Sequence, residues 1–425
     1  MIKNLLKLIK ISMGNIIEWY DFCLYSYFAV VISKTFFTFQ SSFISLLATF
    51  AVFGVGFLAR PAGAVLFGYL GDKVGRHYAM NLSILLMGIA TLSMAFLPGY
   101  SYIGIWAPIL LVVLRLFQGL SAGGQFGNLL SITTEEKSFK FKGFNTGIAY
   151  SVSCIGFLLA AFVSSLVTNF VPAEYQILAW RIPFLLSFAL LLMQLFLKET
   201  DSDENIKSTH DSKESPVITC FKEHTQSMIC ITLLTAVAGS LFYVLITYLV
   251  TYMTVNLHLS KSAALGYNSL GLIIICLFVP LSGLFSDYFG RQKSLCYGFI
   301  ILFLTTLPGF ILLNNLSVIS ILAATFILAL STAIINGVAT PLYSEIFPKR
   351  VRASGCSISY GGGIAISGFA PMLAGIFVEL SPQYGLIEFV YLLNILGLAA
   401  YFFIPKNKIK KVEETRKMNL IRALN

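Results

Sequence analysis

Long hydrophobic runs alternate with short polar segments along almost the whole chain. Each run is continuous over about 20 residues, the length that an α-helix needs to cross the hydrocarbon core of a membrane. Strands of a membrane barrel would alternate strictly over about 10 residues instead. The pattern predicts an all-α membrane protein with twelve transmembrane helices, at residues 12–37, 44–70, 78–97, 105–130, 143–168, 179–197, 226–255, 262–286, 294–313, 316–344, 352–379 and 386–404.

One long polar stretch interrupts this pattern in the interior of the chain. Residues 198–225 hold acidic side chains among serines and lysines, a composition typical of a flexible linker. We therefore expect a six-helix bundle over 1–197, a cytoplasmic linker over 198–225, a second six-helix bundle over 226–404, and a basic cytoplasmic tail over 405–425.

Composition supports a lipid environment. Hydrophobic residues make up 57% of the chain and charged residues only 11%, whereas soluble domains carry about 25% charged residues. The formal net charge of +10 is compatible with a nucleic-acid partner, but the basic residues lie in short loops between hydrophobic runs, so we exclude that partner. The seven cysteines show no metal or disulfide spacing.

The positive charges gather in alternate loops. Lys3, Lys7 and Lys10 precede the first span, and further lysines and arginines follow the second, fourth, sixth, eighth, tenth and twelfth spans. Loops rich in lysine and arginine stay in the cytoplasm. This asymmetry predicts an even number of spans with both termini in the cytoplasm.

A nine-residue motif, G-x-x-x-D-x-x-G-R, follows the second span of each predicted half. The first copy places Gly68, Asp72, Gly75 and Arg76 at the same spacing at which the second copy places Gly283, Asp287, Gly290 and Arg291. Glycines permit a close helix approach, and the charged pair can bind helix ends or neighbouring charges. Together with Glu135 and its looser counterpart Glu345, the two copies predict a cytoplasmic gate that latches and opens as the halves rock.

The repeated motif resembles the signature of the major facilitator superfamily. Further stretches resemble its metabolite:proton symporter family, most of all the proline/glycine-betaine transporters. They are residues 14–22, 60–61, 104–110, 118–124, 180–184, 336–337 and 345–348.

This resemblance implies a fold of two six-helix halves and proton-coupled symport of a small zwitterionic compatible solute by alternating access. Relatives that carry ketoglutarate, citrate or shikimate leave a small mono- or dicarboxylate as the alternative. The expected setting is the bacterial inner membrane, and the expected state is a monomer. The family's fourth span usually reads Gly-Gly-Glu, whereas this chain has Gln125 in place of the acid. Glutamine can hydrogen-bond to a substrate but cannot carry a proton.

Ionisable residues inside the predicted spans are functional candidates, because an unpaired charge there costs about 2.5–3.5 kcal/mol on insertion scales. Glu18 and Asp21 lie three residues apart in the first span, and Tyr25 follows one turn later on the same face. One carboxyl group can exchange the coupled proton. Alternatively, both carboxylates only pair with Arg60 or Arg115.

Candidate substrate ligands lie in three further spans. Arg115 can clamp a substrate carboxylate, with Gln118 one turn on, although a salt bridge to the first span is the simpler alternative. Tyr248 belongs to a tyrosine stripe that can surround a quaternary ammonium group by cation–π contacts or serve as an interface anchor. Asn336 either lines the site or bonds neighbouring helices.

The mechanism that these residues suggest is that protonation of Glu18 or Asp21 weakens pairing to Arg115 and so couples proton and substrate entry. The sequence has no nucleotide-binding loop, zinc motif or nucleophile elbow. We therefore expect no enzyme activity and no cofactor, and a carrier driven by an ion gradient. A transport-inactive membrane sensor with a carrier fold is the alternative from another functional class.

Overall fold

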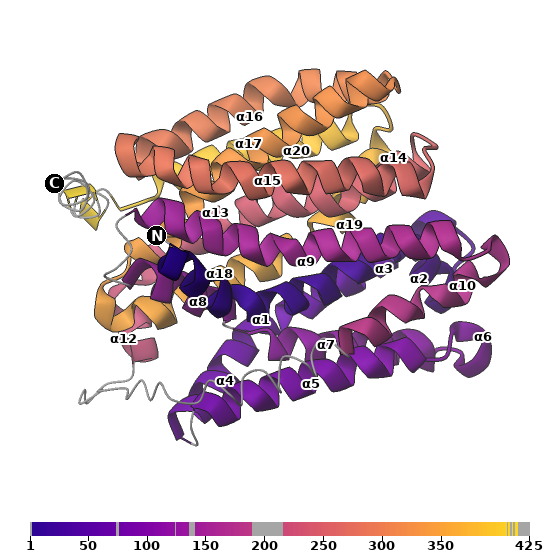
Figure 1. The fold of residues 1–425 in the computed structure, drawn as a ribbon, viewed down its shortest axis with the longest axis horizontal. Helices are drawn as coiled ribbons and strands as arrows, with labels where there is room; N and C mark the ends of the chain where they lie inside the picture. Colours follow the sequence, from indigo (N-terminus) through magenta and orange to yellow (C-terminus); the bar gives the residue numbers. More distant parts are fainter. Residues whose placement is uncertain are drawn as a thin grey trace.

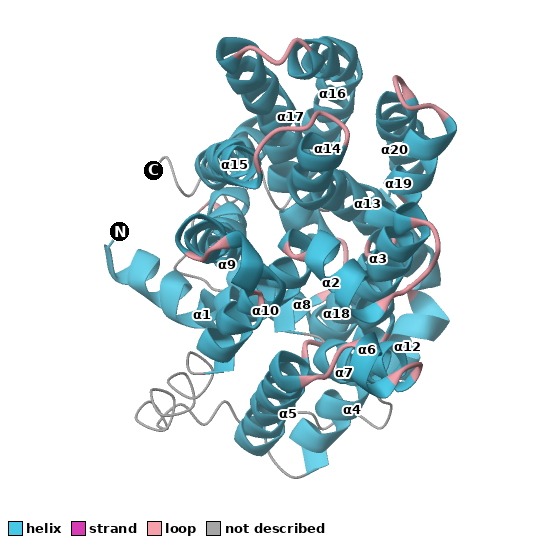
Figure 2. Ribbon diagram, turned by 90° about the vertical axis from the view of Figure 1, so that its right-hand side faces the viewer, coloured by secondary structure: helices cyan, strands magenta, loops and turns pink. Residues whose placement is uncertain are grey.

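The chain forms a bundle of long helices, and the residues that the structure describes contain no strand. In this computed structural model these residues are 2–73, 76–123, 125–135, 141–188 and 216–405, together with 407, 408, 410, 413 and 414. Most helices run along the long axis of the molecule, and the start of α1 and the end of α20 lie toward the same end of the bundle (Figure 1). Figure 2 looks along the helices and shows them packed around one another.

The first part of the chain forms α1 (Ile2–Tyr27), α2 (Ala29–Phe36), α3 (Ser42–Leu58), α4 (Arg60–Lys73), α5 (Arg76–Phe96), α6 (Tyr100–Ile103), α7 (Trp106–Ser121), α8 (Gln125–Glu135), α9 (Lys142–Phe170), the 3-10 turn η1 (Ala173–Tyr175) and α10 (Gln176–Ala179), and residues 181–188 are also helical. The later part forms α12 (Pro216–Glu223), α13 (Thr225–Phe242), the π-helical turn η2 (Tyr243–Tyr248), α14 (Leu249–Val255), α15 (Lys261–Phe289), α16 (Arg291–Asn314), α17 (Val318–Glu345), the 3-10 turn η3 (Lys349–Val351), α18 (Arg352–Ser367), α19 (Ala370–Leu380) and α20 (Gly385–Phe402).

Most of the predicted spans are present as helices of suitable length. Among the described residues, nine spans are long and apolar enough to cross a membrane, and the bent pair α1–α2, with a 66° break at Phe28, makes a tenth. The predicted third span coincides with α5, whose apolar part Leu82–Phe96 is shorter. Of the predicted sixth span, residues 181–188 are helical and 189–197 lie outside the described residues.

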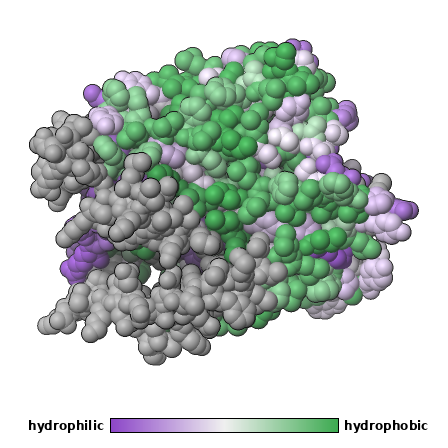
Figure 3. Space-filling model, in the orientation of Figure 1, coloured by the Kyte–Doolittle hydropathy of each residue, from purple (hydrophilic) through white to green (hydrophobic). Residues whose placement is uncertain are grey.

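The surface agrees with a protein embedded in lipid. Hydrophobic residues cover the middle of the visible face, while hydrophilic ones gather at the two ends of the helices (Figure 3). Large apolar side chains such as Phe162, Leu277 and Leu304 are exposed on the long helices. Water would disfavour such a belt, whereas hydrocarbon chains solvate it.

The predicted linker 198–225 is helical at its end. Pro216–Glu223 form α12, and the Cys220 thiol on this helix is fully buried and bonds to the carbonyl of Val351 in η3 at 3.5 Å. Residues 198–215 lie outside the described part of the chain, and the division into halves around them stays a prediction.

Several helices cross so closely that only glycine fits at the crossing. A Cβ on Gly119 of α7 would lie 1.6 Å from the carbonyl oxygen of Gly56 in α3. Between α9 and α15, a Cβ on Gly143 would lie 2.3 Å from the Gly283 oxygen. Small residues let membrane helices gain packing energy where no hydrophobic effect separates lipid from protein.

We expect Gly119→Ala to destabilise the purified protein by about 1–3 kcal/mol, because the added methyl group overlaps the α3 backbone. The measurement is the apparent melting temperature in detergent. Gly266→Ala is the matched control, since a Cβ on Gly266 meets no atom within 4 Å and alanine favours the helix. Equal melting temperatures for the two variants would contradict the packing described for α3 and α7.

Candidate functional site

A cavity with an empty volume of about 440 Å³ lies between the first and the later part of the chain. Its walls come from α1, α8 and α9 on one side and from α13, η2, α17 and α18 on the other. The lining residues are Trp19, Phe126, Tyr150, Ser153, Cys154, Phe157, Thr235, Gly239, Phe242, Tyr243, Asn336, Tyr343, Tyr360 and Ile364. Spaces between the helices of a bundle are a common place for ligand sites.

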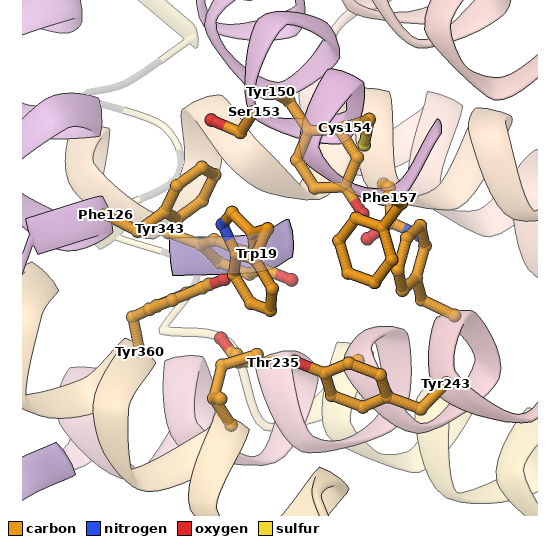
Figure 4. Close-up of a pocket in the computed structure, with 14 residues that line it drawn as sticks. Trp19, Phe126, Tyr150, Ser153, Cys154, Phe157, Thr235, Tyr243, Tyr343 and Tyr360 are labelled. Atoms are coloured by element: carbon orange, nitrogen blue, oxygen red, sulfur yellow. The ribbon is translucent and has the colours of Figure 1, made fainter. Parts of the chain in front are cut away.

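Aromatic rings dominate the walls of the cavity. The indole of Trp19 stacks on Phe157, with ring centroids 5.4 Å apart, and lies 6.3 Å from the ring of Tyr243. Phe126 and Tyr360 pack together at 4.8 Å. In Figure 4, Trp19 lies in the middle of the view, with Phe126 and Tyr360 to one side and Phe157 to the other. These rings present faces and hydroxyl groups to whatever enters the space between them.

The polar groups of the cavity are neutral, because none of its lining residues is an aspartate, glutamate, lysine or arginine. Tyr243 has a hydroxyl group without a hydrogen-bond partner, and it begins the π-helical turn η2. Such turns within helices are frequent at functional sites. Asn336 uses its amide nitrogen on the carbonyl of Thr332 at 3.0 Å. The arrangement can attract a cation through ring faces and donate hydrogen bonds to an anion.

The buried ion pair of Arg60 and Glu18 lies next to the ring of Trp19. The Arg60 guanidinium is 2.9 Å from a Glu18 carboxylate oxygen, and both side chains are 3% exposed. The same guanidinium lies over the rings of Trp19, Phe22 and Phe57 at 5.0, 4.6 and 4.6 Å. The pair lacks hydrogen-bond geometry, since neither Glu18 oxygen has a hydrogen-bond partner in the structure. Aromatic faces therefore carry part of the stabilisation of this charge.

Asp21 has different surroundings from Glu18. Its fully buried carboxylate accepts hydrogen bonds from the hydroxyl groups of Thr91, at 2.8 Å, and Ser187. The Thr91 hydroxyl in turn accepts from the amide of Gln118 at 2.8 Å, and the Gln118 oxygen accepts from Arg115 at 3.0 Å. A chain of polar groups thus links Asp21 to Arg115.

Arg115 is fully buried and only partly satisfied. Its guanidinium lies 3.7 Å above the ring of Tyr25, whose hydroxyl donates to the carbonyl of Thr49 at 3.1 Å. Its Nε and Nη2 atoms have no hydrogen-bond partner in the structure. No salt bridge joins Arg115 to Asp21 or Glu18, all three of which are described residues. The predicted direct pairing is replaced by the bridge through Gln118 and Thr91.

The predicted substrate ligands are dispersed. Asn336 lines the cavity, whereas Tyr25, Arg115 and Gln118 belong to the buried polar chain beside it. Two others lie elsewhere. Gln125, the first residue of α8, reaches the Ser83 hydroxyl at 3.5 Å. Tyr248 packs on Phe50 with ring centroids 5.6 Å apart.

Sequence reasoning did not assign a binding role to most of the cavity residues. The four from α9, Tyr150, Ser153, Cys154 and Phe157, follow the i, i+3, i+4, i+7 spacing of one helix face. That spacing is readable in the sequence. It does not reveal that this face lines a cavity shared with α13 and α18, because lipid-facing and protein-facing sides are both apolar.

The second copy of the repeated motif holds the two parts of the chain together at one end of the bundle. Asp287, near the end of α15, accepts hydrogen bonds from the backbone N–H groups of Gly143 and Phe144 at 3.0 and 3.1 Å. These groups open α9, so the carboxylate satisfies donors that have no partner within their own helix. The acid of the later part thereby caps a helix of the first part.

Arg291 holds the Asp287 carboxylate in place and links it to further acidic side chains. Its Nη2 donates to Asp287 at 2.7 Å and its Nε to Glu345 at 3.0 Å, and its backbone N–H donates to Glu413 from the C-terminal tail at 2.7 Å. The guanidinium is 1% exposed, so this charge network is shielded from solvent. The role of Asp287, Arg291 and Glu345 in a cytoplasmic gate stays a prediction.

The first motif copy lies at the margin of the described structure. Nothing is described of the side chains of Gly68, Asp72 and Arg76, and Gly75 lies outside the described residues. Glu135 contributes a weaker link between the two parts of the chain, with its carboxylate 3.5 Å from Arg352 in an exposed position. Exposed pairs of this kind contribute about 0–1 kcal/mol.

We expect Asp287→Ala to accelerate hydrogen–deuterium exchange of the Gly143 and Phe144 amides by about 2- to 30-fold. This follows from the loss of a cap worth about 0.5–2 kcal/mol. Glu345→Gln is the matched control, because it removes a partner of Arg291 but leaves the two bonds to α9. Unchanged exchange in the Asp287→Ala protein would show that Asp287 does not hold the start of α9.

Known proteins share both the sequence pattern and the architecture of this chain. The Major Facilitator Superfamily model matches residues 13–279, and the Sugar (and other) transporter model matches residues 196–418. A proline/betaine transporter of Salmonella typhimurium is 33% identical over 410 residues, which cover 91% of this chain and 81% of that protein. The alpha-ketoglutarate permease of Escherichia coli is 34% identical over 364 residues, covering 84% and 83% of the two chains.

Solved structures agree on the fold. The proton:xylose symporter XylE bound to 6-bromo-6-deoxy-D-glucose superposes with a TM-score of 0.73 at 15% identity, covering 97% of this chain and 99% of that one. The predicted fold class and the predicted family resemblance are confirmed. From its family matches, its relatives and its helical architecture, this multi-pass membrane protein belongs to the major facilitator superfamily.

Proposed function

We propose that this secondary transporter carries a small zwitterionic compatible solute of the proline or betaine type, together with protons, through the aromatic cavity between its two halves. The observation that carries the proposal is the wall of eight aromatic side chains with no charged residue among them. The proline/betaine transporters among its relatives support the same substrate class.

The cavity offers partners for both ends of such a solute. A substituted ammonium group is weakly hydrated and interacts favourably with the faces of Trp19, Tyr360 and their neighbours, at about 0.5–2 kcal/mol for each well-placed ring. Tyrosine hydroxyls and the Asn336 amide can donate hydrogen bonds to the carboxylate. A neutral cavity avoids the cost of burying an unpaired protein charge whenever the carrier is empty.

The same features weigh against a dicarboxylate. Two carboxylate groups in a cavity lined by no lysine or arginine would lack a cationic partner in low dielectric. The ketoglutarate permease among the relatives keeps this alternative open for direct comparison. A transport-inactive sensor, the alternative from another class, would bind solute without moving it.

Proton coupling is assigned in this proposal to Asp21, with Glu18 as a structural partner of Arg60. Among the described residues, Asp21 accepts hydrogen bonds from two hydroxyl groups and has no cation at salt-bridge distance, so its protonation would break no direct ion pair. Glu18 would leave Arg60 unpaired if it were protonated. The chain through Thr91 and Gln118 offers a route by which the state of Asp21 reaches Arg115.

The remaining parts of the proposal concern topology. The bundles 1–197 and 226–404 rock about the cavity as a monomer in the bacterial inner membrane. The motif end of the bundle, which carries Asp287 and Arg291, faces the cytoplasm with both termini. The basic loops and the repeated motif support this orientation.

We expect betaine and proline to raise the melting temperature of the purified protein, and ketoglutarate to leave it unchanged, because ligands that bind only the native state stabilise it. Tyr360→Leu should weaken betaine binding by about 3- to 30-fold, while Tyr360→Phe, which keeps the ring, should retain most of it. Tyr297→Leu makes the same change at a position that is 52% exposed on α16 and serves as control. Stabilisation by ketoglutarate alone would favour the carboxylate alternative.

Transport itself is tested by uptake of labelled betaine or proline into proteoliposomes with an imposed inward proton gradient. We expect Asp21→Asn to abolish gradient-driven accumulation while keeping solute exchange across the membrane, because asparagine retains hydrogen bonding but cannot be protonated. Glu174→Gln, an exposed change after α9, is the control. Full accumulation by the Asp21→Asn protein would remove the proposed coupling role, and binding without uptake by the unmodified chain would favour the sensor.

A further inference from the structure

The hydroxyl group of Tyr243, in the wall of the aromatic cavity, is buried without a hydrogen-bond partner among the described residues. The whole side chain is only 1% exposed. Other polar groups of the wall are engaged within their own helices. The Ser153 hydroxyl donates to the carbonyl of Ala149 at 2.9 Å, and the Asn336 amide bonds to its own helix as described above. A buried hydroxyl without a partner lowers stability, so a ligand that bonds to it removes that cost.

Four aromatic rings fix the direction in which this hydroxyl points. The ring centroids of Phe57, Phe53, Phe242 and Trp19 lie 5.3, 5.7, 5.9 and 6.3 Å from that of Tyr243. Close packing on several sides leaves the Tyr243 ring little freedom to turn away. The hydroxyl is therefore preorganised, and a ligand that bonds to it does not have to order the side chain first.

The backbone that carries Tyr243 is held by contacts outside its own helix. Tyr243 is the first residue of the π-helical turn η2, and the carbonyl of Ile246 in this turn accepts a hydrogen bond from the Asn268 amide of α15. The Asn268 oxygen in turn accepts from the Tyr27 hydroxyl of α1 at 2.6 Å. Helices of both parts of the chain thus hold the turn, and with it the position of Tyr243.

The two ends of a betaine-type solute differ in what they can offer this hydroxyl. A trimethylammonium group has no N–H to donate, so it interacts with the faces of aromatic rings. A carboxylate accepts hydrogen bonds, and bonds to a charged acceptor are the stronger ones. In Figure 4, Tyr243 lies on one side of Trp19, while Phe126 and Tyr360 lie on the other. The two ends of the solute therefore match different sides of the cavity.

We propose that the Tyr243 hydroxyl donates a hydrogen bond to the carboxylate of the bound solute, whose ammonium group lies against Trp19, Phe126 and Tyr360. Tyr243 is then the residue that selects a zwitterion over a cation that shares only the ammonium group. This assignment rests on the substrate class of the proposed function.

The test compares betaine with tetramethylammonium, which has the quaternary ammonium group but no carboxylate. Dissociation constants are obtained by titrating the purified full-length protein with each compound and following its melting temperature. Tyr243→Phe should weaken betaine binding by about 10- to 100-fold, the range expected for a lost hydrogen bond to a charged group, and leave tetramethylammonium binding unchanged. Tyr360→Leu should weaken binding of both compounds. Tyr297→Phe removes the same hydroxyl at a position 52% exposed on α16 and is the matched control.

The melting temperature without ligand separates recognition from a structural role. The empty Tyr243→Phe protein should melt no lower than the unmodified protein, because the hydroxyl has no partner to lose. A clear drop would show that the hydroxyl is already bonded and would overturn the inference.

Two further outcomes distinguish this inference from the proposed function. Equal betaine affinity of the Tyr243→Phe and unmodified proteins, or equal losses for both compounds, would overturn the inference and leave the proposed function standing. If the unmodified protein bound ketoglutarate and not betaine, the proposed function would fail. The effect of Tyr243→Phe on ketoglutarate binding would still decide whether this hydroxyl holds a carboxylate.

Discussion

The seam between α9 and α15 is held by backbone contacts rather than by long side chains, and the rest of the site depends on it. At one end, Asp287 satisfies the first N–H groups of α9. Further along, the carbonyl of Gly283 occupies the space beside Gly143 that a side chain would fill. Near the cavity residue Cys154, the Ser151 hydroxyl of α9 donates to the carbonyl of Cys276 in α15. In a hydrocarbon environment these backbone and glycine contacts stabilise the fold, because lipid offers unsatisfied polar groups no hydrogen-bond partner.

Two buried arginines inside the bundle, Arg60 and Arg115, are stabilised in different ways. Arg60 is neutralised by Glu18 and surrounded by three aromatic rings, which suits a fixed structural charge. Arg115 has one hydrogen bond to Gln118, one ring beneath it and two nitrogen atoms without partners. Arg60 likewise has two nitrogen atoms, Nε and Nη2, without a hydrogen-bond partner. The two arginines therefore differ in charge pairing: among the described residues, Arg60 has a carboxylate at salt-bridge distance and Arg115 does not.

Two helices, α9 and α17, run between the cavity and the cluster of Asp287, Arg291 and Glu345. α9 begins at Lys142, beside the backbone groups that Asp287 caps, and passes the cavity at Tyr150 and Phe157. α17 carries Asn336 and Tyr343 at the cavity and ends at Glu345, the partner of Arg291.

The sequence by itself determined the number and placement of most spans, the repeated motif and the buried ionisable residues, because hydropathy and spacing are local properties of the chain. It could not orient the helices about their axes. Lipid-facing and protein-facing sides are both apolar, so the amphipathic pattern that orients a helix in a soluble protein is weak here. Only the tertiary structure paired Glu18 with Arg60, turned Arg115 toward Tyr25 and Gln118, and brought Trp19, Tyr243 and Tyr360 around one cavity. These pairings depend on packing between segments far apart in the chain. There, shape and hydrogen-bond satisfaction decide which helix faces meet.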